Sequence, residues 1–147
     1  MKLEILVSAV NEDVDTLAER MNLQADAIIV NQCGENTYRE YTYQEHRIRC
    51  YSFAERGVGL SRNNCLMRAQ GDICLFADED IIYRPGAVRA IEAEFEKNPD
   101  ADMILFNMDV PEDRATYHID GYGRVRWYNC GRYPVSYTHL TLPTTPY

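Results

Sequence analysis

Short apolar runs alternate with amphipathic segments along most of the chain, and this alternation constrains the fold more than any other feature. Runs rich in β-formers predict buried strands at residues 3–9, 27–30, 48–53, 73–77 and 103–106. Between them the pattern predicts helices from Val14 to Met21, from Leu60 to Ala69 and, after Pro85, over 86–98, with apolar residues at helical spacing in the first and last. Strands that alternate with helices form mostly parallel sheets with helices on both faces. We therefore expect an α/β, Rossmann-like domain.

Three other segments lack this pattern. Residues 31–45 are polar and rich in tyrosine and predict a loop, and residues 117–127, with two central glycines, predict a hairpin. Residues 134–147 hold no Asp, Glu, Lys or Arg but three of the six prolines, which predicts extended or disordered chain. This tail resembles an adapter-derived string at the ends of translated metagenomic fragments, so we interpret it as disordered or artefactual. The domain is then expected to span 1–133.

Charge and composition exclude several classes of protein. The chain has 15 basic and 23 acidic residues, a net charge of −8, which argues against general binding to nucleic acid. A nucleotide could still bind through a metal ion. No apolar run approaches the roughly 20 residues that cross a bilayer, and the N-terminus lacks the apolar stretch of a signal peptide, so we expect a cytoplasmic location or peripheral contact with a membrane. The five scattered cysteines predict reduced thiols.

An acidic turn, Asp78-Glu79-Asp80, follows the predicted strand at 73–77. Two nearby carboxylates repel each other, and a divalent cation removes that conflict. Mg²⁺ or Mn²⁺ binds one or two carboxylates together with waters and phosphate oxygens. An acidic turn alone is more often merely solvated, but this one follows a segment with Gly57, Gly59 and Arg62. Glycines allow close backbone approach, a helix start favours phosphate, and a guanidinium binds a base or a phosphate.

Four segments, taken in order and spacing, resemble glycosyltransferase family 2, which has the GT-A fold: Ser8–Glu12, Val30–Gln32, Gly59–Asn63 and Gly71–Asp80. The resemblance covers about residues 3 to 108. It implies transfer of a sugar from a nucleotide diphosphate donor to an acceptor hydroxyl, with inversion and with Mg²⁺ or Mn²⁺. The acceptor would be a glycan or a lipid-linked glycan, as in polysaccharide biosynthesis.

The resemblance also assigns roles by position. It implies that Asp80 binds the metal, that Asp78 contacts the metal or the ribose, and that Arg62 faces the base or the diphosphate. The nucleotide cleft would be lined by Ala9, Asn11 and Glu12. The family usually has an aspartate at the end of the second strand, where it contacts the base, whereas this chain has Asn31 and Gln32. An amide both donates and accepts, so Asn31 is expected to read a base edge, with uridine the family's commonest base.

The chain is shorter than the catalytic domains of that family, which generally exceed 200 residues. The general base normally lies well after the acidic turn. The acids there match no family motif, and we interpret them as solvated: Asp109, Glu112, Asp113 and Asp120. We therefore expect a fold incomplete at its C-terminal side, a donor-binding half without its general base, and no efficient transfer.

Other functions stay open on the sequence. A nucleotidyltransferase would need a loop rich in glycine and basic residues after the first strand, which Ala9 to Asp13 lacks. A phosphoacceptor receiver domain would use acids such as Glu12 and Asp13 but gives the Gly-Leu-Ser-Arg-Asn segment no role. A non-catalytic nucleotide-binding domain is the third alternative.

Overall fold

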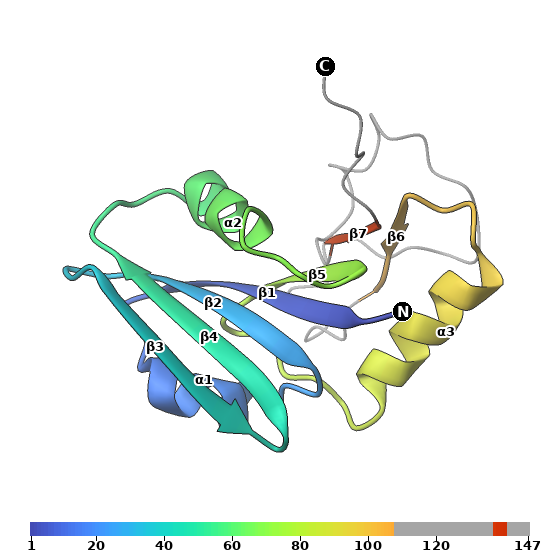
Figure 1. Cartoon of the computed structure of the whole chain (residues 1–147), viewed down its shortest axis with the longest axis horizontal. Helices are drawn as coiled ribbons and strands as arrows, with labels where there is room; N and C mark the ends of the chain where they lie inside the picture. Colours follow the sequence, from blue (N-terminus) through green and yellow to red (C-terminus); the bar gives the residue numbers. More distant parts are fainter. Residues whose placement is uncertain (108–136, 141–147) are drawn as a thin grey trace, which may run out of the picture.

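A computed structural model describes residues 1–107 and the strand at 137–140. In this part of the chain one seven-stranded sheet carries three helices (Figure 1). The strand order is β3-β4-β2-β1-β5-β7-β6. The strands are β1 (Leu3–Val10), β2 (Asp26–Gln32), β3 (Thr37–Tyr43), β4 (His46–Phe53), β5 (Ile73–Asp78), β6 (Met103–Leu105) and β7 (Tyr137–Leu140). The helices are α1 (Val14–Met21), α2 (Val58–Leu66) and α3 (Ala87–Lys97). No helix in the described residues is long and apolar enough to cross a membrane.

The centre of the sheet is parallel, as the alternating pattern predicts. Strand β1 pairs in parallel with β2 on one side and with β5 on the other, and β2 pairs in parallel with β4. Ser8 of β1 lies opposite Val30 on one side and opposite Asp78 on the other. The carboxyl ends of these strands therefore meet at one edge, where open α/β sheets bind ligands.

Helices cover both faces of the sheet (Figure 1). One apolar cluster joins alternate residues of β1, such as Ile5 and Val7, to α1 and α3. A second cluster, on the other face, joins Leu6 and Ile28 to Cys65 of α2. The predicted stripe of α3 is confirmed, because the buried residues of that helix are Val88, Ile91 and Phe95. The α/β prediction is thus confirmed.

The predicted loop at 31–45 is wrong over most of its length, because residues 37–43 form strand β3. Strand β3 pairs antiparallel with β4, with Tyr43 opposite His46. The two residues of the turn, Gln44 and Glu45, have φ of 46° and 71°, the left-handed region that tight hairpin turns use. Asparagine and glycine usually signal such turns, and an edge strand that is exposed shows no apolar alternation. Both signals for β3 are therefore missing from the sequence.

The structure describes only part of the tail. Four of its residues form β7, which pairs antiparallel with β5 and with β6, so that Cys74 lies opposite His139 and Ile104 opposite Thr138. Such pairing uses backbone groups, which every non-proline residue has, and so it needs no apolar pattern. The expected hairpin at 117–127 and the acids from Asp109 to Asp120 lie outside the described residues.

Candidate nucleotide-binding site

Most of the predicted site residues lie at the carboxyl edge of the parallel strands. Asn11 follows β1, Asn31 lies near the end of β2, and Asp78 ends β5. Helix α2, which carries Arg62, begins above the same edge (Figure 1). The topology therefore brings together segments that are far apart in the sequence.

The turn between β1 and α1 is held by the end of β2. Asn11 has φ of 53°, and its N–H donates to the carbonyl of Gln32 at 3.1 Å. Glu12 donates its N–H to Oδ1 of Asn31 at 3.1 Å and accepts from Nδ2 of Asn31 at 2.9 Å. Its carboxylate pairs with Arg20 of α1. Helix α1 then begins with Asp13 as its N-cap, which accepts from the N–H of Asp15.

The start of α2 is held by β1 and β2. The buried hydroxyl of Ser61 accepts from Ser8 Oγ at 2.8 Å and donates to the carbonyl of Val30 at 3.3 Å. The N–H of Gly57 donates to Oε1 of Gln32. Gly57 has φ of 147°, which L side chains rarely adopt, so this position favours glycine. The helix start is therefore fixed beside the strand ends.

The acidic turn faces α2. Asp78 Oδ1 accepts from Nη2 of Arg62 at 2.9 Å, and the two side chains are 43% and 28% exposed. Nε of Arg62 is buried and has no partner among the described residues. Asp80 is exposed. The charge of Asp78 is therefore compensated by a guanidinium, while the carboxylate of Asp80 faces solvent.

The acidic turn has too few ligands to hold a metal ion by itself, so it suits only a cation that also binds waters and phosphate oxygens. Among the described residues, no group of three His, Cys, Asp or Glu side chains could hold a cation. Mg²⁺ and Mn²⁺ often bind through one or two carboxylates and complete their shells with waters and phosphate oxygens. The donor set of Asp78 and Asp80 suits a cation that a diphosphate shares, with Asp80 as the more accessible ligand.

Of the three residues expected to line the cleft, two line a cavity and the third is buried. Asn11 and Glu12 line a cavity of about 710 Å³, together with Asn31, Ser52 of β4 and several residues of β3. Ala9 is fully buried in the apolar cluster under α1 and is not among the residues that line this cavity. Among the cavity residues, sequence reasoning missed Thr37 and Arg39 because they belong to the unpredicted strand β3.

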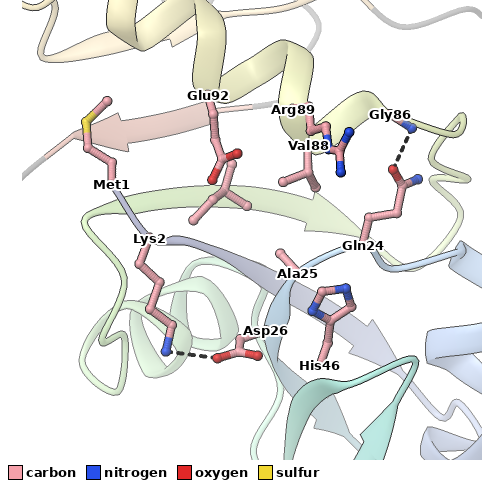
Figure 2. A pocket seen from close by; sticks show the side chains of 11 residues that line it. Met1, Lys2, Gln24, Ala25, Asp26, His46, Gly86, Val88, Arg89 and Glu92 are labelled. Carbon is pink, nitrogen blue, oxygen red and sulfur yellow. Dashed lines mark hydrogen bonds and ion pairs between the residues drawn. The ribbon is translucent and has the colours of Figure 1, made fainter.

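A second cavity, of about 740 Å³, lies at the opposite, amino ends of the strands (Figure 2). Lys2 pairs with Asp26 there at 2.9 Å, and Oε1 of Gln24 accepts from the N–H of Gly86 at 2.8 Å. Helix α3 contributes Arg89 and Glu92 to its wall. This cavity holds none of the residues that the sequence assigns to nucleotide or metal, so the candidate site is the carboxyl edge.

Comparisons with known proteins agree with the fold. The family model described as glycosyl transferase family 2 matches residues 5–139. The crystal structure of Staphylococcus aureus TarS 1–349 in complex with UDP-GlcNAc is 16% identical, with a TM-score of 0.60 over 80% of this chain and 37% of that one. Another crystal structure of S. aureus TarS is 19% identical, with a TM-score of 0.52 over 80% of this chain and 24% of that one. No curated protein matches.

These matches have two consequences. At such identity the structural likeness shows a shared fold, the GT-A type of α/β fold, and the chain spans well under half of the length of TarS. The family match favours a glycosyltransferase over the nucleotidyltransferase and receiver interpretations.

Proposed function

Because the chain belongs to glycosyl transferase family 2, we propose that it is the donor-binding half of a glycosyltransferase and binds a nucleotide diphosphate sugar. The observation that carries the proposal is the meeting of the acidic turn, Arg62 and the start of α2 at one sheet edge. The base is proposed to be uridine, the family's commonest choice. The TarS structure, solved with UDP-GlcNAc, is consistent with that choice.

The charges of the site suit a diphosphate. The amide groups at the start of α2 and the guanidinium of Arg62 favour bound phosphate. Asp80, with or without Asp78, would hold Mg²⁺ or Mn²⁺, and such a cation neutralises the charge of the departing diphosphate. Transfer would go with inversion to a hydroxyl of a glycan or lipid-linked acceptor. The general base is proposed to lie outside this chain, and the cytoplasmic location stays a prediction.

Calorimetric titration of UDP into the 147-residue chain, with and without Mn²⁺, tests the proposal. Circular dichroism first establishes that each sample is folded. We expect binding that needs Mn²⁺ and that is lost in Asp80→Ala. The matched control is Asp100→Ala, an exposed carboxylate after α3, which should bind UDP as the wild type does.

Two results would contradict the proposal. A folded chain that binds none of UDP, GDP and CDP with Mn²⁺ has no working donor site. Covalent labelling by acetyl phosphate at Asp78 would indicate a receiver domain instead. Efficient transfer of a sugar by these 147 residues would refute the narrower prediction that the general base lies elsewhere.

A further inference from the structure

Strand β2 ends in two amide side chains, and each bonds to the backbone of a different loop. We propose that Asn31 and Gln32 are positioning residues, which fix the β1–α1 turn and the start of α2 on either side of the donor cleft. On this proposal neither amide reads the nucleobase. The inference rests on the proposed function, because it concerns the same donor site.

Asn31 holds the β1–α1 turn by two bonds to one residue. Its Oδ1 accepts from the N–H of Glu12, and its Nδ2 donates to the carbonyl of Glu12. Glu12 lies between Asn11, whose positive φ turns the chain, and Asp13, the N-cap of α1. Asn31 borders the cavity of about 710 Å³ but is only 4% exposed, and both polar atoms of its amide are already bonded to the backbone of Glu12.

Gln32 points to the other face of the sheet, because successive residues of a strand alternate. Its Oε1 accepts from the N–H of Gly57, the N-cap of α2. A glycine N-cap has no side chain that could make a capping bond, so at this helix end the side-chain acceptor comes from a neighbouring strand. Gln32 is 5% exposed. The two amides thus hold the two loops at the carboxyl edge of β2, the β1–α1 turn and the start of α2.

The bonding pattern explains why position 31 holds an amide instead of the acid that the family resemblance leads one to expect. A clamp on both backbone groups of one residue needs one donor and one acceptor on the same side chain. An aspartate at position 31 would set a carboxylate oxygen against the carbonyl of Glu12, which is why Asn31→Asp is the informative variant. Position 32 needs only an acceptor, so Gln32→Glu should preserve the bond to Gly57.

Calorimetric dissociation constants for UDP, CDP and GDP with Mn²⁺ test these roles in the full chain. We expect Asn31→Asp and Gln32→Met to weaken every bound diphosphate by the same factor, about tenfold, which is the usual effect of an unpaired buried polar group. Gln32→Glu keeps the acceptor for the N–H of Gly57 and should therefore weaken binding less than Gln32→Met, which a residue that merely fills space would not predict.

The matched control is Gln24→Glu. Gln24 clamps backbone in the same way, accepting from the N–H of Gly86 and donating to the carbonyl of Arg84, but at the opposite edge of the sheet (Figure 2). It should leave all three dissociation constants unchanged. If Asn31→Asp alters the ratio among the bases, for example by raising UDP affinity alone, Asn31 reads the base and the inference is wrong.

Amide hydrogen exchange tests the clamps without nucleotide. Asn31→Ala should speed exchange of the Glu12 N–H about tenfold and leave Gly57 unchanged, and Gln32→Met should do the reverse. Unchanged exchange in both variants overturns the inference. If the wild type binds no diphosphate, the proposed function fails, and exchange alone decides whether the two amides are clamps.

Discussion

A buried ion pair ties the end of α2 to the sheet, and removing one of its partners should cost much of the stability of the domain. Glu4 of β1 and Arg49 of β4 lie 2.7 Å apart across β2, with side chains 2% and 7% exposed. The other oxygen of Glu4 accepts from the N–H groups of Gln70 and Gly71. Arg49 also donates to the carbonyl of Arg68 at 3.0 Å, so the network holds the segment after α2.

The size of the effect follows from the burial. Arg49→Met leaves the carboxylate of Glu4 buried without a cation, and Glu4→Met leaves the buried guanidinium without its counter-charge and two N–H groups without an acceptor. Breaking a buried pair in this way costs about 3–5 kcal/mol, against a total stability of about 5–15 kcal/mol. At about 2–4 °C per kcal/mol, the melting temperature should fall by roughly 10 °C. The double variant buries no charge and should cost less than the sum of the two.

Urea unfolding followed by circular dichroism measures these free energies. The control is Arg47→Met, because Arg47 lies two residues away on the same strand and pairs with Glu40 where both side chains are exposed. That variant should unfold close to the wild type, since exposed pairs contribute little. The reasoning is refuted if Arg49→Met is no less stable than Arg47→Met, or if the two buried substitutions are additive.

Four further predictions concern packing, thiols and metal. Gly71→Ala should cost about 1–3 kcal/mol in urea unfolding, because a Cβ there would lie 2.8 Å from Cβ of Glu4 and 3.0 Å from the carbonyl of Lys2. Burial raises the pKa of the Cys50 and Cys65 thiols to about 12 and that of Cys74 to about 11. A disulfide reagent at pH 8 should therefore modify the half-buried Cys33 before these three. Because these buried thiols hold their protons more tightly in the folded than in the unfolded chain, the stability that they contribute is complete below pH 9 and is lost as the pH rises toward 12. The urea midpoint should therefore fall over that range. Mn²⁺ alone should bind weakly in calorimetry and tighten when UDP is present, because Asp78 and Asp80 supply too few ligands.

Buried elements of the fold were predictable, and edge elements were not. Strands β1 and β5 are covered on both faces, so they appear in the sequence as continuous apolar runs. The stripe of α3 appears because only one face of that helix is buried. Strand β3 is an exposed edge, where polar residues are tolerated on both faces, and β7 is held by backbone pairing. Neither kind of strand leaves an apolar period that a sequence reader could count.

The site shows the same division, at the level of single side chains. Parallel strands share a carboxyl edge, so the order of motifs was enough to bring Arg62 and Asp78 together. Counting in twos from buried Ile29 would also have assigned Asn31 to the face of α1, opposite to the face of α2 that carries those charges. The hydrogen bond from Asn31 to the backbone of Glu12 could not be predicted from the sequence, because it depends on the positive φ of Asn11. The sequence therefore predicts which residues gather at the edge and which face of the sheet each occupies, whereas the hydrogen bonds that hold the β1–α1 turn emerge only from backbone geometry.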